Sequence, residues 1–509
     1  MMTQEIIAAK SAKLQGVVCE LLGIVARAVD ERIPAHVVEQ LVLKEVLAAG
    51  RAAMQLLFDQ LGVGDVGETC RLEDGRVLKR LEGTKKRAYQ SVFGHFELER
   101  YVYATREGQE QELIPLDARL KLPEGKFSYL LQDFDQHLAT EEPFGQVAET
   151  IERILDVRQY VDSLERTNQT IASYVEAFHV QQQPPPASEE GAILVETADG
   201  KGVPIRRPAD APPIHDHEHR VGPKPDRKKM ATLASVYSVD PFPRTPEDVV
   251  KSLFRDPRAD REDKPSARPR PCHKRVRACL NYTDSEGEEI VARPAMFGWM
   301  ADEVKARNPD GAKPVVCVMD GQEDLWTEIA VFQADSERTE ILDLLHVTPR
   351  LWKAARIFSG SQKEAVAFVR GRLLSILRGK VAGVIQGLKR MASLRKLPAT
   401  ERRAIKVICA YLSHNRHRMR YHEYLAQGYP IASGVIEGAC RNVVKDRLER
   451  TGMNWTMPGA KAMLELRCVQ LCGDWDKFIS FYIAAETSRL YPHQQVLDTL
   501  TWNILALAA

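Results

Sequence analysis

Two short apolar runs that each end in Asp-Gly constrain the fold of this chain most. The apolar run 192–195 precedes Asp199-Gly200, and the run 314–319 leads directly to Asp320-Gly321, so each aspartate is expected at a strand end followed by a Gly turn. Short runs rich in Val and Ile are typical of buried strands. A single Asp-Gly is weak evidence, because the pair is common in simple turns. Two of them predict a sheet that presents carboxylates, the hard oxygen ligands that Mg²⁺ prefers.

A third acid, Glu437, lies far downstream in the Gly-rich apolar segment 432–438. Ser433 is a plausible N-cap, which would place Glu437 near the first turn of a helix. Asp199, Asp320 and Glu437 are the predicted catalytic residues and ligands of Mg²⁺ or Mn²⁺, with two ions expected. Two such ions can clamp the attacking and leaving oxygens in phosphoryl transfer.

Several segments carry a family resemblance. Residues 195–200, 318–321, 343–346, 433–440 and 444–455 resemble the signature blocks of bacterial insertion-sequence transposases of the ISKra type, which are related to the Mutator-like DDE enzymes. The blocks occur in order between Asp199 and Trp455. The resemblance implies an RNase H-like core with Asp199, Asp320 and Glu437 as its D, D, E triad. It also implies metal-dependent DNA strand cleavage and strand transfer.

The same resemblance sets the expected partners and location. The partners are DNA, as the terminal inverted repeats of the element and its target, and further copies of the chain in a homodimer or higher oligomer on DNA. The expected location is the bacterial cytoplasm, in association with the nucleoid. Two alternatives remain open: a catalytically inactive, transposase-derived DNA-binding protein, and an RNase H-like nuclease without strand transfer.

Asp343 and His346 form an Asp-x-x-His pair at the end of another apolar run. In the resembling family a block of this kind follows the second acid, so both are possible accessory residues. Asp343 is an alternative third acid, and His346 would orient a phosphate or a water. The competing interpretation is a helix N-cap and a partly buried histidine.

Length and composition limit the class of protein. At 509 residues the chain should contain two to four domains. It has no run of 18 apolar residues and no signal-peptide pattern at its N-terminus, which argues against a membrane protein. Its nine cysteines are scattered and several lie in apolar runs, so a disulfide framework is not expected.

Changes in periodicity and composition predict a multidomain α+β protein, with an RNase H-like α/β core that an all-helical basic segment interrupts. Before the core we expect helical and small β regions that bind DNA. The predicted parts are a helical region at 1–75, a small sheet with a helix-turn-helix-like region at 76–183, a Pro-rich linker at 184–190, the core at 191–349 and 433–475, the basic helical insertion at 350–432, and a helical tail at 476–509.

Within these parts, two local patterns carry functional weight. The helix-turn-helix prediction rests on residues 143–178, whose second helix would carry Arg166, Asn168, Gln169 and Thr170; an ordinary helical hairpin is the alternative. In the core, strands at 193–197, 203–205 and 230–239 precede a helix at 295–307 and strands at 315–319 and 340–343. Three strands, a helix and a further strand follow the RNase H-like order.

Basic residues suggest where DNA would bind. Between Arg350 and Arg420 only Glu364 and Glu401 oppose many Lys and Arg side chains, and such an excess favours a polyanion partner. The DNA contacts expected there are Arg370, Arg372 and Arg378. After Glu437, Lys445 and Arg447 would contact phosphates, and Trp455 would either stack on an unpaired base or cap the core.

Overall fold

The computed structural model describes residues 4–105, 113–206, 228–254, 268–284, 287–450 and 452–493. The chain is a multidomain α+β protein that divides into two compact units, Met1–Tyr174 with Trp475–Ala509, and Val175–Asp474. The boundary therefore precedes the expected linker at 184–190, which holds a short 3₁₀ helix, η1 (Ala187–Glu189). The tail is also not separate, because it belongs to the N-terminal unit. Among the described helices, none combines the length and apolarity needed to cross a bilayer.

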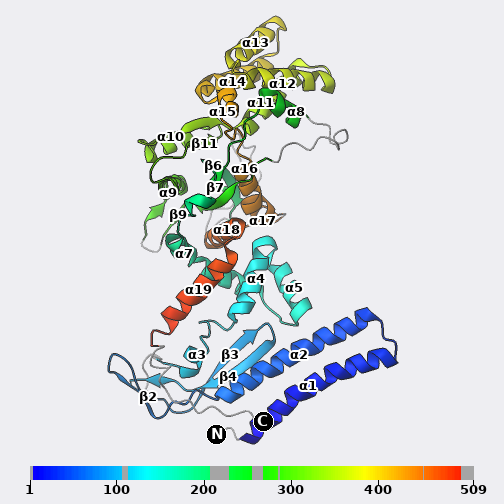
Figure 1. The fold of residues 1–509 in the computed structure, drawn as a ribbon, viewed down its shortest axis with the longest axis vertical. Coiled ribbons are helices and arrows are strands. Elements are labelled where there is room, and N and C mark those ends of the chain that lie inside the picture. Colours follow the sequence, from blue (N-terminus) through cyan, green and yellow to red (C-terminus); the bar gives the residue numbers. More distant parts are fainter. Residues whose placement is uncertain are drawn as a thin grey trace, which may run out of the picture. The chain divides into compact units, whose positions relative to one another are not determined.

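The N-terminal unit joins long helices to small antiparallel sheets, as the sequence predicts (Figure 1). Its first two helices, α1 (Gln4–Asp30) and α2 (Ala35–Leu61), pack together. One sheet has the order β1-β2-β5, and β3 pairs with β4 as a hairpin. The strands are β1 (Thr69–Arg71), β2 (Val77–Arg80), β3 (Lys85–Ser91), β4 (Gly94–Arg100) and β5 (Tyr103–Ala104), and the remaining helices are α3 (Pro115–Arg119), α4 (Tyr129–Glu141), α5 (Phe144–Leu155), α6 (Val161–Ala172) and α19 (Trp475–Leu490).

The expected helix-turn-helix corresponds to α5 and α6, but one of its four expected base-reading residues is unavailable. Asn168 is buried, and its side-chain amide donates a 2.8 Å hydrogen bond to Gln136 Oε1 on α4. Asn168 therefore belongs to the packing of α6 against α4. Arg166, Gln169 and Thr170 are exposed on the same helix.

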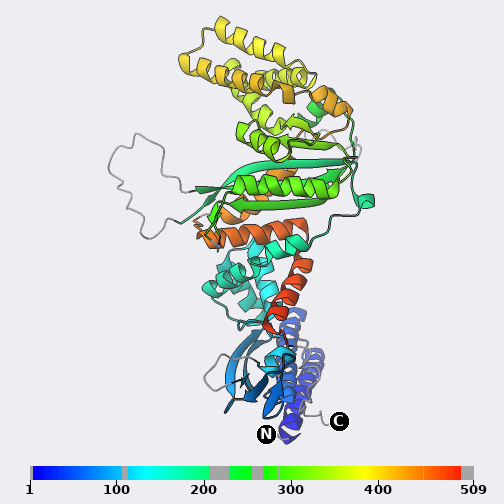
Figure 2. The ribbon, with the colours of Figure 1, turned by 90° about the vertical axis from the view of Figure 1, so that its left-hand side faces the viewer.

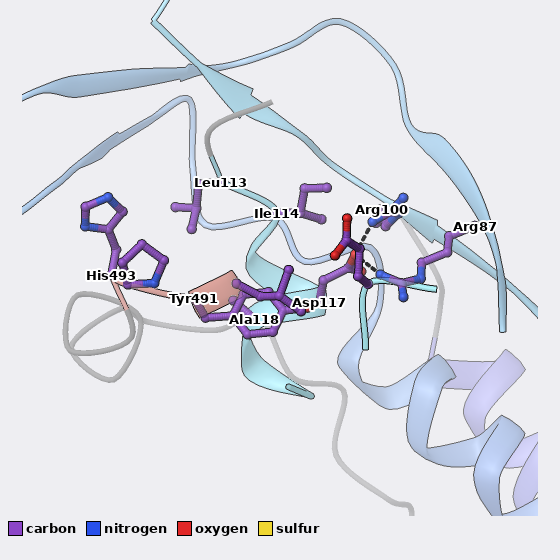
Figure 3. Close-up of a pocket in the computed structure, with 11 residues that line it drawn as sticks. Arg87, Arg100, Leu113, Ile114, Asp117, Ala118, Tyr491 and His493 are labelled. Carbon is purple, nitrogen blue, oxygen red and sulfur yellow. Dashed lines mark hydrogen bonds and ion pairs between the residues drawn. The ribbon is translucent and has the colours of Figure 1, made fainter. Parts of the chain in front are cut away.

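A cavity of about 400 Å³ in this unit lies beside a buried carboxylate, Asp117 on α3 (Figure 3). The carboxylate accepts a 2.6 Å hydrogen bond from Arg87 on β3 and a second from Arg100 on β4. Only 4% of the Asp117 side chain is exposed, against 11% and 13% for the two arginines. One carboxylate thus joins both strands of the hairpin to α3.

We expect Asp117→Ala to destabilise this unit by about 3–5 kcal/mol, because it leaves two buried guanidinium groups without their counter-charge. Hydrogen exchange of peptides from β3 and β4 would measure the change in stability. The matched control is Asp74→Ala, since Asp74 forms a 2.6 Å pair with Arg76 in which both side chains are more than 40% exposed. The control should cost less than about 1 kcal/mol. Equal effects of the two substitutions would contradict this account of Asp117.

The second unit is built on a mixed five-stranded sheet of order β12-β11-β6-β7-β8. Its strands are β6 (Ile193–Pro204), β7 (Lys228–Val239), β8 (Cys272–Leu280), β11 (Val315–Met319) and β12 (Thr339–Leu342). The neighbours β6, β11 and β12 are parallel, whereas β7 and β8 are antiparallel to their neighbours. The predicted separate strand at 203–205 was wrong, because β6 runs on unbroken and pairs with β7 as far as Pro204↔Lys228.

Helices cover both faces of this sheet. On one face, α9 (Ala292–Arg307) and α10 (Glu323–Phe332) bury Phe297, Met300 and Ile329 against β6, β7 and β11. On the other, α8 (Pro246–Leu253) and α11 (Leu344–Phe358) pack in a separate core with Val195, Val316 and Ile341. The inner strands are covered on both sides, which explains why β11 is a continuous apolar run and why β6 begins with one. The unit also contains α7 (Val175–Gln181) and the paired short strands β9 (Tyr282–Thr283) and β10 (Glu289–Ile290).

The basic insertion is all helical, as predicted. It consists of α12 (Gln362–Leu377), α13 (Val381–Leu394), α14 (Ala399–His414) and α15 (Tyr421–Ala426), which gather beyond the β12 edge of the sheet (Figure 2). Two tyrosines of α15 connect the insertion to β12. The hydroxyls of Tyr421 and Tyr424 donate hydrogen bonds to the carbonyls of Leu342 and Glu340 at 2.7 and 3.2 Å. The chain then returns to the sheet through α16 (Gly434–Ala439), a π-helical turn (Cys440–Lys445), α17 (Asp446–Leu448) and α18 (Met457–Cys472).

A buried acid on the central strand makes the stability of this unit depend on pH. Glu196 is fully buried and accepts a 2.7 Å hydrogen bond from Gln333, and burial raises its pKa to about 7. Between its ordinary pKa of 4.5 and about 7, the folded state therefore binds more protons than the unfolded state. Stability should fall as pH rises through this window and then level off.

Glu196→Gln should remove that pH dependence. We expect the variant to be more stable than the wild type by about 3 kcal/mol at pH 8, and the gain to vanish near pH 4. Denaturant unfolding of the two proteins at both pH values measures the difference. A gain that does not vary with pH would contradict the assignment.

Candidate active site

Asp199 lies within β6, five residues before its end, and not at a strand end followed by a Gly turn as the sequence suggested. It pairs with Leu233 of β7, and the following Gly200 pairs with Thr232. Gly200 and Gly202 do not interrupt the strand, because both pair with residues of β7, which is as long as β6. Asp199 is half-buried, and burial raises its pKa.

Two other aspartates lie near Asp199. The parallel ladder of β11 and β6 ends with Cys317↔Glu196, three residues before Asp320 and Asp199 on their respective segments. The ladder of β11 and β12 reaches Met319↔Leu342, and the Asp343 amide donates a 2.9 Å hydrogen bond to the Met319 carbonyl, so Asp343 lies beside Asp320. The negative charge of Asp320 adds to burial in raising the pKa of Asp199. Asp320 and Asp343 thus directly follow adjacent parallel strands, and Asp199 lies on the next strand close enough to Asp320 for their charges to interact.

Asp320 directly follows β11, as predicted, and several donors surround it. Its Oδ1 accepts hydrogen bonds from the Tyr411 hydroxyl at 2.7 Å and from the Gly321 amide at 2.5 Å. Its Oδ2 lies 3.2 Å from His346 Nδ1. A Cβ at Gly321 would lie 2.5 Å from the Tyr411 ring, so the glycine lets this ring approach the acid.

His346, on the first turn of α11, bridges two of the predicted acids. Its Nδ1 faces Asp320, and its Nε2 lies 3.0 Å from Glu437 Oε1 and 3.7 Å from Asp343 Oδ2. The hydrogen bond with Asp320 raises the pKa of His346 to about 9, against the effect of burial. At neutral pH the imidazole is therefore protonated and offsets part of the negative charge of the cluster.

Burial raises the pKa of Asp320, but the hydrogen bonds from His346 and Tyr411 and the His346 charge more than offset it, so that the pKa falls to about 2. Asp320 is therefore ionised at every physiological pH. An ionised carboxylate at a strand end is the state required for a metal ligand.

Asp343 is the fully buried N-cap of α11. Its carboxylate accepts hydrogen bonds from the Leu345 amide at 2.8 Å, from the Ser433 amide at 3.2 Å and from the Ser433 hydroxyl. Ser433 precedes α16, as expected, but its hydroxyl binds Asp343 and makes no capping bond to its own helix. Because both oxygens of Asp343 are engaged, this acid is less available to a cation than Glu437.

Glu437 lies in the first turn of α16, as predicted, and its side chain is 40% exposed. Its Oε1 lies 3.0 Å from Nε2 of the His346 ring. On the same segment, the buried Cys440 places its thiol 3.5 Å from Asp199 Oδ2. The turn that carries Glu437 thus reaches both His346 and, through Cys440, Asp199.

Three side chains of the site could hold a cation only if His346 first loses its proton, because a protonated imidazole has no free electron pair for a metal. One ligand atom each of Asp343, His346 and Glu437 lie within 4.8 Å of one another. Asp320 adds an oxygen on the other side of the His346 ring. Oxygen donors dominate the set, which suits Mg²⁺ or Mn²⁺ better than a thiolate-seeking metal.

Two residues of the site were not predicted from the sequence as partners of the acids. Tyr411, on α14, donates to Asp320, and Arg350 lies with its guanidinium 3.4 Å from the centre of the Tyr411 ring and 3.9 Å from Asp320 Oδ1. Tyr411 is 91 residues from Asp320 along the chain. No local pattern marks such a contact, because it depends on how the insertion folds back.

The structure corrects part of the expected DNA-binding set. Arg447 is fully buried with its guanidinium 4.9 Å from the Trp455 ring, and Trp455 is 9% exposed and donates to the Leu448 carbonyl at 3.1 Å. Trp455 therefore caps the core, which was the alternative interpretation, and Arg447 packs beneath it. Neither side chain presents itself to DNA in this conformation. Lys445 on the neighbouring turn is exposed.

The three arginines expected in the insertion differ from one another. Arg370 is exposed, whereas the Arg372 guanidinium lies 3.3 Å from the centre of the Phe368 ring and burial lowers its pKa. Arg378 donates a 2.8 Å hydrogen bond to Glu247 of α8. Of this set, Arg370 is the residue that the structure leaves most open to a polyanion.

Compared with known proteins, the sequence matches no family model and is not significantly similar to any curated protein. A function for the protein can therefore be assigned only from the geometry of the site and from the sequence segments that carry its residues.

Proposed function

We propose that this protein is a DDE-type transposase of a bacterial insertion sequence, which binds transposon ends and catalyses metal-dependent strand cleavage and strand transfer. The observation that carries the proposal is that Asp320 and Glu437 both contact His346, and that the charges of Asp320 and His346 reach Asp199. These are the three acids that the family resemblance marks. Asp199 lies on β6, Asp320 follows β11, and Glu437 lies on a helix that comes after the helical insertion.

The topology of the sheet supports the same proposal. The chain forms β6, β7 and β8 as an antiparallel meander, then adds β11 and β12 parallel to β6 on its other side. From this arrangement we infer an RNase H-like core. Asp199 lies on the central strand β6, Asp320 follows the parallel strand β11, and Glu437 lies on α16, which comes after the helical insertion.

The residues fit a site for two divalent cations. Asp199, Asp320 and Glu437 would hold the ions, and Asp343 would orient α11 and α16. When bound, such ions polarise the scissile phosphate and stabilise the attacking and leaving oxygens. His346 and Arg350 hold positive charge next to Asp320 and would orient the phosphate, while Tyr411 fixes the carboxylate through its 2.7 Å hydrogen bond.

The direct test is incubation of the purified protein with DNA that carries the inverted repeats flanking its coding sequence. With Mg²⁺ or Mn²⁺ we expect cleavage at the repeat ends and joining of the released 3′ ends to a second DNA. Cleavage without joining would favour an RNase H-like nuclease. Binding without metal-dependent cleavage would favour an inactive DNA-binding derivative.

The helical insertion should contribute sequence-independent affinity. Arg370, Lys389 and Arg390 are exposed and form no ion pair with a described residue. Replacing all three with Gln should make the slope of log affinity against log salt shallower, by roughly 0.9 for each phosphate that the variant no longer neutralises. Arg378→Gln is the control, since that guanidinium is already paired with Glu247. A triple variant with the wild-type slope would show that this face does not meet DNA.

Self-association on DNA is part of the same proposal. Val18, Leu22, Val25 and Val29 on α1 are 47% to 74% exposed and recur at alternating spacings of four and three. That spacing is the seam of a coiled coil, which a helix from a second copy would cover. The stripe therefore supports a homodimer or higher oligomer.

A further inference from the structure

A groove of about 580 Å³ lies between α8 and α11, outside the carboxylate cluster. It is lined by Leu253 of α8 and, on α11, by Leu345, Pro349, Trp352, Lys353 and Arg356 among others. The α11 residues recur at intervals of three and four, so they form one face of that helix. The groove therefore follows one face of α11, with Leu253 of α8 at its side.

The floor and walls of the groove are apolar. Trp352 is half-buried, with its ring centre 6.3 Å from that of Phe254, which packs against the core below. Leu253 and Leu345 remain 47% and 40% exposed at its sides. A half-buried aromatic ring that lines an open groove is a surface on which a flat ring can stack.

The rim of the groove is cationic. Lys353 and Arg356 are exposed, and neither forms an ion pair with a described acidic residue. Arg356 follows Trp352 by four positions and so lies on the same face of the helix as the indole, and Lys353 lines the same groove. Aromatic stacking together with unpaired cations matches the chemistry of a nucleotide, with its flat base and anionic phosphate.

The groove is continuous with the carboxylate cluster through α11. Leu345 and Pro349 of the groove are the neighbours of His346 and Arg350, whose side chains reach Asp320. The two faces are thus adjacent on the same helix. Residues one helical turn apart on either face are separated by about 5.4 Å along the helix axis.

We propose that this groove binds an unpaired nucleotide of the DNA strand whose phosphate lies at the carboxylate cluster, with the base stacked on Trp352 and its phosphates on Lys353 and Arg356. The inference rests on the proposed function. A base within a duplex has both faces covered by its neighbours, so the platform selects a strand that is unpaired at this position.

Binding of a labelled oligothymidylate and of a duplex of equal length, each measured without divalent metal, tests the proposal on the full chain. Trp352→Ala should weaken oligothymidylate binding roughly 5- to 100-fold, which corresponds to the removal of one stacked base. Trp352→Phe should restore most of the affinity. Duplex affinity should change less than about twofold. Lys353→Gln with Arg356→Gln should weaken single-strand binding and lower its salt dependence.

Phe332→Ala is the matched control, because Phe332 is 39% exposed on α10, away from the groove. Equal losses of affinity for single strand and duplex, or an oligothymidylate affinity unchanged in both Trp352 variants, would overturn the inference while wild-type cleavage stands. If the wild type neither binds nor cleaves DNA, the proposed function fails as well.

Discussion

Asp320→Asn is expected to abolish metal-dependent DNA cleavage while leaving DNA affinity nearly unchanged. Asn keeps the shape of the side chain and can still accept the Tyr411 hydrogen bond, but it lacks the charge that holds a divalent cation. The ions supply several kcal/mol of transition-state stabilisation, so the rate should fall by at least about a thousandfold. Cleavage rate and DNA affinity, measured on the same preparation, separate the two effects.

Asp302→Asn is a suitable control, since Asp302 is an exposed acid on α9 of the same unit. It should cleave at the wild-type rate. If Asp320→Asn also retained activity close to the wild type, the assignment of the second acid would be wrong.

Glu437→Gln should reduce cleavage by a similar factor, and Asp343→Asn by a smaller one. Glu437 is 40% exposed and meets His346 at 3.0 Å, so its carboxylate remains accessible to a cation. Asp343 is fully buried and accepts three hydrogen bonds that organise α11 and α16. The comparison therefore separates a ligand from a residue that positions the helices.

Thermal unfolding provides the second readout for this pair. Glu437→Gln should leave the unfolding transition in place, whereas Asp343→Ala, which removes the N-cap entirely, should destabilise the unit by about 1–2 kcal/mol. An active Glu437→Gln protein together with an inactive, stably folded Asp343→Asn protein would show that Asp343 is the third acid.

The sequence predicted the position of some candidate acids in the fold better than that of others. Asp320 and Asp343 follow strands whose apolar runs end with them, and a buried strand of this length is visible in the sequence. Asp199 was misplaced at a strand end because Gly200 and Gly202 look like a turn. In the fold both glycines pair with β7, and a long neighbouring strand overrides that local signal.

Contacts between distant segments were not accessible from the sequence. Tyr411 reaches Asp320 and Ser433 reaches Asp343 across about ninety residues, and these contacts exist only because the insertion returns to the sheet. The basic segment shows a related limit. Its excess of positive charge was evident from the sequence. Which arginines are available to DNA depends on the side of the helix that each occupies: Arg372 packs on Phe368, whereas Arg370 is exposed.

Crystals of the protein soaked in Mn²⁺, with anomalous scattering to locate the ion, would show which carboxylates hold the metal. We expect manganese bound by Asp320 together with Asp199 or Glu437, and disappearance of that signal in Asp320→Asn. Absence of manganese from this cluster in the wild type, or manganese held elsewhere in the unit with these three carboxylates unliganded, would contradict this assignment.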